Sequence, residues 1–400
     1  MKAKWEVKKI LNIKGLTLFI LAFMIFNCIN IYRSYDPSYL NKSNDDLLDA
    51  EIRMGELLEG KITQDKVNNF NSKYNEVIEL YESNQLNSTP DYSRFYTGYV
   101  FGDYNLFTKI NNELKRRLTY NQQISALKNE AEEKAKIYET SSRYNYMLNK
   151  TIVDSYGTRY IDSYYYNEPA INLFTYNFSS ILIILLIMFF CIPLFTNERD
   201  SDMLTILACT KRGYLKRGIR ADKIITMVMF VAFITILFTL SDFVMLKSAL
   251  KFNGLTQPLF VLEKFKYTPT TMSIIAFYIL CTFMKFIGFT SIGFITMIIA
   301  RLSKSSVLGY IITLISILLL MTLKSMDSNT VVQYINLINP VSLFLLYKNF
   351  YNCELINVFS MPVFNFVMYI ALGALTSIVL CIINLLVPFF YSHKAKRNVL

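Results

Sequence analysis

Six apolar stretches, each about long enough to cross a lipid bilayer, constrain this chain more than any other feature of its sequence. They cover residues 15–32, 172–195, 224–246, 271–300, 307–323 and 366–391. A membrane-spanning helix needs about 20 mostly apolar residues. Helices also satisfy their own backbone hydrogen bonds in hydrocarbon, where water is absent. The sequence therefore predicts an all-α, polytopic membrane protein with six transmembrane helices.

The charge distribution predicts how the chain lies in the membrane. The net charge is +11, and the excess lysine and arginine stands beside the ends of the apolar stretches. Short loops that are rich in lysine and arginine stay on the cytoplasmic side. We therefore expect both termini and the loop near residues 196–223 to be cytoplasmic. The same placement argues for contact with membrane lipids and against nucleic-acid binding.

Three regions follow from this pattern. Residues 1–33 contain a basic interfacial segment and the first span, and residues 171–400 contain the other five spans. Between them, residues 34–170 are polar and carry more acid than base, which predicts an extracytoplasmic domain of ordinary size.

The sequence predicts helices in the polar region, residues 34–170. Apolar residues recur at intervals of three and four in residues 67–81, 107–118 and 124–135, which is the spacing of one helix face. Pro90 follows a polar turn and interrupts the pattern. We expect these helices to form a small bundle.

Tyrosines are concentrated at the end of this region, just before the second span. They are Tyr156, Tyr160, Tyr164, Tyr165 and Tyr166. Such a cluster is typical of an aromatic belt at the outer membrane interface. An aromatic ligand surface is the alternative.

The sequence offers no residues for the common forms of catalysis. Its only histidine is His393, and it contains no phosphate-binding loop, no GxSxG elbow and no HExxH pair. None of its six cysteines falls within residues 34–170, and none has zinc-type spacing. We therefore expect no enzyme activity, no cofactor and no metal site in this chain.

Two charged residues stand within or near predicted spans and form the candidate substrate path. Lys285 lies in the fourth apolar stretch, and Asp242 lies near the outer end of the third. Charges at membrane depth usually face a bundle interior or a water-filled path. A structural ion pair or snorkelling to the interface are the alternatives. Gly288 and Gly293 would permit close helix packing in the same stretch.

A further apolar patch covers residues 338–350 between the last two spans. It is too short to cross the bilayer, and it contains Pro340. A re-entrant or interfacial element is one interpretation, and burial against the bundle is the other.

The polar loop between spans two and three carries an amphipathic pattern, which predicts a cytoplasmic helix over residues 197–213. Asn197 is suited to cap it, and Gly213 to end it. Met203, Ile206 and Leu207 then form an apolar stripe at helical spacing. A solvated loop that only satisfies the charge topology is the alternative.

The order of these parts resembles an ABC transporter permease subunit of the type-2 exporter class, with a large extracytoplasmic domain between the first two spans. The residues that carry the resemblance are Glu198, Leu204, Leu207, Thr210, Lys211, Arg212, Gly213 and Lys223. Two positions depart from the family's pattern. Ser201 and Asp202 stand where an early glycine is expected, and Tyr214 stands where arginine is frequent.

The resemblance implies a transport subunit of the bacterial cytoplasmic membrane without an ATPase of its own. A separate ABC ATPase would dock on the cytoplasmic helix, and a second permease subunit, identical or different, would complete the pathway. The implied docking residues are Glu198, Met203, Leu204, Ile206, Leu207 and Arg212. The substrate class that it implies is amphipathic: an antimicrobial peptide, a lipid or a drug. The alternative is a membrane sensor or scaffold whose outer domain binds a ligand.

Overall fold

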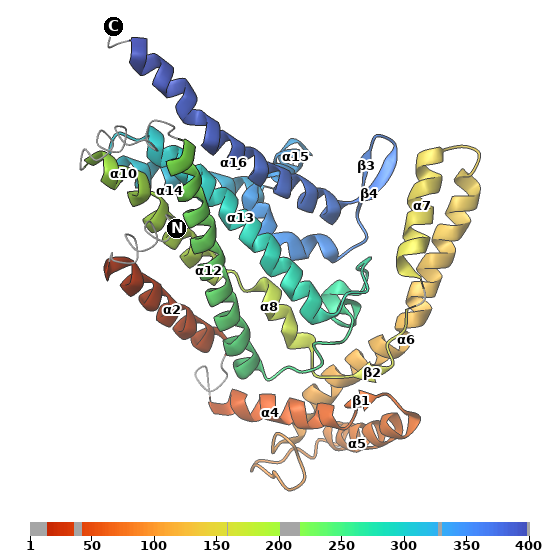
Figure 1. The fold of residues 1–400 in the computed structure, drawn as a ribbon. Helices are drawn as coiled ribbons and strands as arrows, with labels where there is room; N and C mark the ends of the chain where they lie inside the picture. Colours follow the sequence, from red (N-terminus) through yellow and green to blue (C-terminus); the bar gives the residue numbers. More distant parts are fainter. Residues whose placement is uncertain (1–13, 36–41, 158, 201–216, 327–329, 398–400) are drawn as a thin grey trace.

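The computed structural model describes residues 14–35, 42–157, 159–200, 217–326 and 330–397 (Figure 1). The described chain is mostly helical, and six of its helices are long and apolar enough to span a membrane. The all-α, six-span prediction is confirmed. The spans are α2 (Lys14–Tyr35), α9 (Phe178–Cys191) continued by α10 (Pro193–Asp200), α12 (Arg217–Leu250), α13 (Ile274–Leu302), α14 (Ser306–Ser325) and α16 (Asn365–Arg397).

Helices α9 and α13 form the centre of the bundle. The most apolar part of each of these two spans is 67% buried, compared with 17% for α14 and 11% for α16. Glycines in α13 allow this burial, because a Cβ added at Gly293 would lie 2.6 Å from the Sδ of Met227. The close helix packing expected from Gly288 and Gly293 is confirmed, and α14 and α16 are left at the periphery.

The connection between spans five and six contains two short helices, α15 (Thr330–Ile338) and η4 (Pro340–Phe350), and the predicted apolar patch corresponds to η4. Helix α15 follows the outer end of α14. The amide of Asn336 donates to the carbonyl of Leu323 at 3.1 Å, and that of Asn339 donates to the carbonyl of Leu320 at 2.8 Å. Asn339, the later of the two asparagines, thus bonds the carbonyl that lies further from the end of α14. Helix α15 therefore runs antiparallel beside α14.

Helix η4 returns along α13. The carbonyl oxygen of Pro340 would lie 2.8 Å from a Cβ at Gly288, halfway along α13. At its other end, Phe350 packs on Phe277 near the start of α13, with 4.8 Å between ring centroids. The two helices therefore form a hairpin whose returning arm, η4, is buried against the bundle. Burial is the interpretation of the 338–350 patch that the structure confirms, and a re-entrant or interfacial position stays a prediction. Irregular backbone at membrane depth is stable only where protein covers it.

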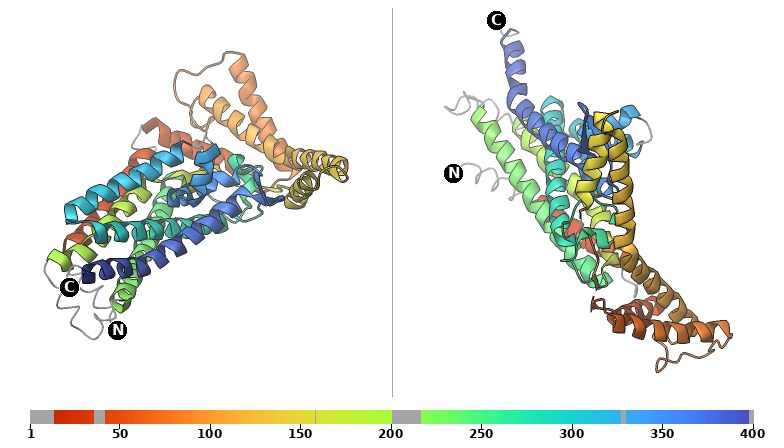
Figure 2. Two further views of the ribbon diagram at one scale, coloured as in Figure 1. Left: turned by 90° about the horizontal axis from the view of Figure 1, so that it is seen from above. Right: turned by 90° about the vertical axis from the view of Figure 1, so that its right-hand side faces the viewer.

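The polar region forms an elongated domain at the end of the bundle opposite to the start of α12 and the end of α16 (Figures 1 and 2). Its elements are α4 (Lys42–Glu56), β1 (Gly60–Lys61), α5 (Gln64–Glu82), α6 (Val100–Tyr138), α7 (Arg143–Tyr156) and β2 (Ser163–Tyr164), followed by η1 (Glu168–Ile171) and α8 (Asn172–Thr175). Helix α6 contains both of the later predicted helical runs. Its first half packs against α4 and α5 and its second half against α7, so the domain is extended rather than a compact bundle.

The loop between α12 and α13 forms a platform for this outer domain. It contains the short helices η2 (Leu259–Val261) and η3 (Glu263–Phe265). The ring of Tyr120 on α6 stacks on Phe260 with 5.2 Å between centroids, and its hydroxyl donates to the carbonyl of Lys266 at 3.1 Å. Arg159 donates to the carbonyl of Thr268 at 2.6 Å. The outer domain is therefore attached to the membrane domain by buried contacts.

Arg117 on α6 is the most connected of these buried residues, with 1% of its surface exposed. Its guanidinium donates to the carbonyls of Ser163 and Tyr165, each at 3.1 Å, and pairs with the carboxylate of Glu113. It also lies 4.4 Å from the ring centroid of Tyr164. A single cation thus fixes β2 and the chain leading into span two against α6.

The tyrosine cluster is used differently from the sequence expectation. Tyr156, Tyr164 and Tyr166 are buried among the contacts of the outer domain, and Tyr160 is exposed at 67%. The predicted interfacial belt is wrong for the three buried residues. Neither the spacing of apolar residues nor the composition of the sequence indicates that α6 and the α12–α13 loop cover these three tyrosines.

The last span is preceded by a two-stranded hairpin, β3 (Leu355–Val358) and β4 (Met361–Phe364), which lies beside α7 (Figure 1).

Replacing Arg117 by Met should lower the local stability of the α6–β2 contact by about 3 kcal/mol, because the partly buried carboxylate of Glu113 and the two carbonyls lose their cation. Amide hydrogen exchange of residues 100–168 measures this opening free energy. The exposed Lys115, changed to Met, is the matched control and should shift it by less than about 0.5 kcal/mol. Equal protection in the two variants would show that Arg117 does not hold this junction.

Candidate functional site

A buried polar network joins the first three spans at the outer half of the membrane domain. Asp242 on α12 is 6% exposed. The side-chain amide of Asn27 on α2 donates to its carboxylate at 2.6 Å. The hydroxyl of Tyr176, just before α9, donates to the Oδ1 of Asn27 at 2.7 Å. Asn27 therefore connects Asp242 to Tyr176, and Ser179 on α9 lies beside the same carboxylate.

Lys285 on α13 adds a cation to this region without pairing directly with Asp242. It is 8% exposed, and the Asp242 carboxylate acts on it electrostatically. Among the residues that the structure describes, however, Lys285 makes neither an ion pair nor a hydrogen bond. The structure brings the two predicted path residues into one region but does not form the direct pair that was their structural alternative.

This arrangement leaves a cation in the interior of the bundle with no direct partner in the described chain. A charged side chain at membrane depth costs about 2.5–3.5 kcal/mol on insertion scales. Asp242 is the anion that would compensate this charge. It does not contact Lys285 directly, and its carboxylate already accepts a hydrogen bond from Asn27. A group that entered beside Lys285 would therefore find an available ammonium group. This is the chemistry expected of a residue on a path for polar or anionic parts of a substrate.

A second polar cluster connects four spans at the end of the bundle that lies away from the outer domain, and we call it the Phe195 clamp. The ring of Phe195 on α10 lies 4.5 Å from the Nζ of Lys223 and 4.6 Å from the guanidinium carbon of Arg301. Lys223 on α12 also donates to the carbonyl of Leu194 at 2.6 Å. Arg301 on α13 donates to the carbonyl of Asn384 on α16 at 2.6 Å.

The Phe195 clamp was not anticipated as a unit from the sequence. The sequence singles out Lys223, at the end of the family-like pattern, but neither Phe195 nor Arg301 as its partners. The sequence does offer one signal, which is that Phe195 stands just before a loop rich in lysine and arginine. An aromatic ring face attracts cations that lie within about 6 Å of it. The partners on α13 and α16 come from distant parts of the chain.

The predicted ATPase-docking residues are not placed by the structure. Met203, Leu204, Ile206, Leu207 and Arg212 lie outside the described residues. Glu198 lies in α10, but its side chain is not among those described. The described chain does show where this loop begins and ends, which is at the Phe195 clamp.

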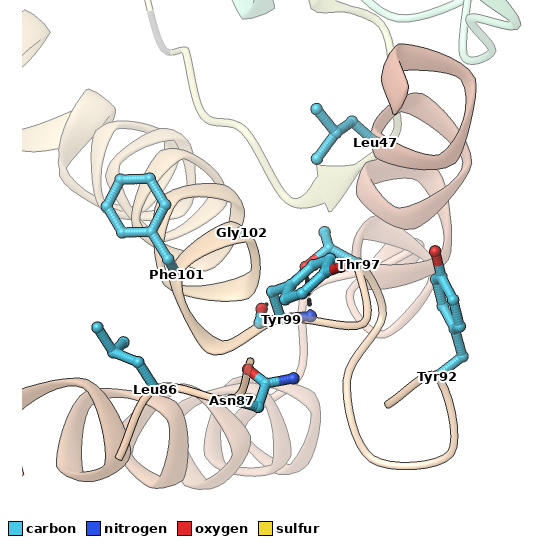
Figure 3. Close-up of a pocket in the computed structure, with 8 residues that line it drawn as sticks. All are labelled: Leu47, Leu86, Asn87, Tyr92, Thr97, Tyr99, Phe101 and Gly102. Atoms are coloured by element: carbon cyan, nitrogen blue, oxygen red, sulfur yellow. Dashed lines mark hydrogen bonds between the residues drawn. The ribbon is translucent and has the colours of Figure 1, made fainter. Parts of the chain in front are cut away.

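The outer domain contains an open pocket of about 470 Å³ between α4, α6 and the loop 83–99 (Figure 3). Its walls are mostly apolar and aromatic. They are formed by Leu47, Leu86, Asn87, Tyr92, Thr97, Tyr99, Phe101 and Gly102. Concave, mainly apolar sites with a few polar groups are typical of small-ligand binding.

Buried hydrogen bonds fix the polar edge of this outer pocket. The carboxylate of Asp103 accepts from the backbone N–H groups of Tyr96 at 2.9 Å and Thr97 at 2.8 Å, and from the hydroxyl of Thr97 at 2.7 Å. Burial raises the pKa of Asp103, and these donors act in the opposite direction. Asn87 donates to the carbonyl of Gly98 at 2.6 Å. The pocket is therefore formed by an ordered loop.

Within the described part of the chain, no group of three or more His, Cys, Asp or Glu residues is arranged to hold a metal ion.

Comparison with known proteins adds no assignment. No family model, no curated protein and no solved structure matches this chain. The functional argument therefore rests on the residues and their geometry.

Removing the charge of Asp242 and removing the charge of Lys285 should affect the melting temperature differently. Asp242→Leu removes the acceptor of a buried amide and should cost about 1–3 kcal/mol, seen as a lower melting temperature of the purified protein in detergent. Lys285→Met should leave the melting temperature unchanged or raise it, because no direct partner is lost. The lipid-facing Leu240→Ala on α12 serves as the control. An equal loss in the two charge variants would mean that Lys285 and Asp242 are a structural pair.

Proposed function

We propose that this chain is the transmembrane permease subunit of an ATP-driven ABC exporter. A separate ATPase subunit docks on the cytoplasmic loop between α10 and α12 and powers the movement of an amphipathic substrate across the membrane. Antimicrobial peptides, lipids and drugs are the substrate classes. The chain itself hydrolyses no ATP, since its sequence contains no phosphate-binding loop.

The single observation that carries this proposal is the Phe195 clamp. It holds the two ends of the loop against each other through Lys223 and Leu194, and it extends through Arg301 to α13 and α16. A partner that pushes on the loop would therefore act on four spans together rather than on one. Rigid-body movement of packed helices is the usual way in which such a push opens or closes a path.

The intramembrane polar residues support a path through the same helices. Lys285 and Asp242 lie on α13 and α12, the two spans that the Phe195 clamp connects at their inner ends. An amphipathic substrate needs apolar walls for most of its surface and a few polar groups for the rest. Lys285 and the Asn27–Asp242 network supply the polar groups within an otherwise apolar bundle.

The orientation that fits the charge pattern places both termini and the α10–α12 loop in the cytoplasm, and residues 34–170 outside. The membrane is the bacterial cytoplasmic membrane. The peripheral helices α14 and α16 face lipid or a second permease subunit, identical or different, that completes the pathway.

The alternative, a membrane sensor or scaffold, has one observation in its favour, which is the pocket in the outer domain (Figure 3). A ligand bound there would act on the membrane domain through the Tyr120 and Arg159 contacts. A sensor would need no ATPase on the α10–α12 loop, so ATPase binding distinguishes the two functions.

Leu207→Asp should abolish co-purification with the cognate ABC ATPase. A charge in a dry apolar groove costs several kcal/mol, while the spans that control insertion are unchanged. Lys216→Ala is the matched control, since a lysine that snorkels to lipid should contribute little to docking. The measurement is the ATPase recovered with the affinity-purified chain. Equal recovery with Leu207→Asp would contradict docking at this stripe, and no recovery with the unaltered chain would overturn the permease proposal.

A further inference from the structure

The hairpin formed by β3 and β4 is almost entirely apolar, although it lies outside the spans. Residues 355–364 contain only two polar side chains, Asn357 and Ser360, and no charged one. A two-stranded hairpin is at best marginally stable in water by itself. A hairpin with so few polar groups therefore needs a surface other than water to cover the parts that the protein leaves open.

The turn of the β3–β4 hairpin holds a large aromatic side chain at a position that disfavours one. Val358 pairs with Met361, so the two turn residues are Phe359 and Ser360, whose φ angles are 49° and 64°. Two-residue turns with positive φ normally use asparagine, aspartate or glycine, since a bulky side chain is strained there. Phe359 is also 98% exposed, so packing within the described chain does not offset this strain. Strain of this kind is typical of positions with a function.

Hydrogen bonds at both ends give the hairpin a defined shape. At its base, the backbone N–H of Asn365 donates to the carbonyl of Glu354 at 2.9 Å. At its tip, the backbone N–H of Ser360 donates to the Oδ1 of Asn357, also at 2.9 Å. Strand β4 packs against α7 of the outer domain. The ring of Phe359 is therefore presented at the end of an ordered element.

The hairpin lies near the level at which the last span begins. This span starts at Asn365, directly after β4. A strand of four residues is about 13 Å long. The hairpin also turns aside from the axis of α16 rather than extending it (Figure 1). Its tip therefore stays within reach of the lipid surface on the side of the outer domain.

Helix α15 indicates what covers the surface next to the hairpin. The bond from Asn339 to the carbonyl of Leu320 places α15 at the depth of the last turns of α14, which is a span. Its side chains Tyr334 and Ile338 are exposed at that depth. Leu355 of β3 lines a groove together with Tyr334, so the hairpin lies beside this exposed face. Exposed apolar surface on a membrane-spanning bundle is a site of contact with lipid.

We propose that the tip of the β3–β4 hairpin is an interfacial anchor, whose Phe359 ring inserts into the lipid leaflet on the side of the outer domain. Met361, which is 56% exposed and follows the turn, enters the leaflet beside it. Apolar and aromatic side chains are the groups that bury in the boundary between headgroups and acyl chains. Because β4 packs against α7, the anchor attaches the outer domain to the lipid surface. The inference does not rest on the proposed transport function.

Brominated lipids test this directly, because bromine quenches tryptophan fluorescence only at short range. The probe is Phe359→Trp in the full chain, whose only native tryptophan is removed by Trp5→Phe. The protein is reconstituted in phosphatidylcholine bilayers with or without bromine on the acyl chains. The emission of the Phe359→Trp variant should be blue-shifted and should be quenched in the brominated bilayer.

Two matched variants in the same background calibrate the quenching. Leu240→Trp replaces a lipid-facing side chain of α12 with 59% exposure, and its emission should be quenched. Tyr92→Trp replaces a side chain with similar exposure, 60%, in the loop 83–99, which lies away from the bundle (Figure 1). Its emission should not be quenched, because this loop is surrounded by water.

A further variant separates anchoring from formation of the turn. Phe359→Asn places a residue that tolerates positive φ in the turn, so the hairpin should stay folded. With Met361→Trp as the reporter, Phe359→Asn should lower the quenching toward the level of Tyr92→Trp, because the tip loses its anchor. Unchanged quenching of this reporter would overturn the role of Phe359.

The emission of the Phe359→Trp variant also distinguishes the other surroundings of the tip. Emission typical of tryptophan in water, without quenching, would show a solvated tip and overturn the proposal. Blue-shifted emission that brominated lipid does not quench would place the tip against protein, such as a second copy of this chain, and would overturn the lipid anchor as well.

Discussion

The absence of water in the bilayer interior is the constraint on which this structure depends. A polar group on a span must find its partner within the protein, since hydrocarbon offers none. Asn27 meets this requirement by accepting from Tyr176 and donating to Asp242. The otherwise apolar contact between α2, α9 and α12 is thereby given one specific register. Apolar packing alone is less selective, because lipid tails compete with side chains of the same kind.

The same constraint distinguishes Asp242 from Lys285. Asp242 is directly bonded and has a clear structural role, whereas Lys285 shares its electrostatic environment without a direct contact. Retaining a cation in this position costs free energy that neither packing nor hydrogen bonding in the described chain offsets. This missing compensation is the observation from which the proposed substrate path through Lys285 is argued.

Contacts outside the hydrocarbon join the spans into a connected unit. Arg117 and the α12–α13 platform attach the outer domain at one end, and the Phe195 clamp connects α10, α12, α13 and α16 at the other. At each of these two sites, a single cation or aromatic ring contacts several chain segments. The segments are therefore held in one defined arrangement. Movement at the Phe195 clamp is thus able to reach the outer domain through packed helices.

The sequence predicted the features that depend on local pattern. Hydropathy placed all six spans, and helical spacing found α5 and both halves of α6. Lys285 and Asp242 stood out because charges are rare in apolar stretches. The burial of Tyr164 and the partners of Phe195 could not be predicted, because both depend on residues far away in the chain. Asn27 is a polar residue in the first apolar stretch and therefore a visible signal, but only the fold supplies its partners.

The most direct test of the account is whether ATP moves the spans at the Phe195 clamp. Spin labels on cysteines introduced at Ile225 of α12 and Val307 of α14, both lipid-facing, would report the distance between two inner ends after the native cysteines are replaced. With the ATPase bound, a non-hydrolysable ATP analogue should shift the distance distribution measured by pulsed electron paramagnetic resonance. The same distribution with and without nucleotide would contradict the claim that the loop drives these helices.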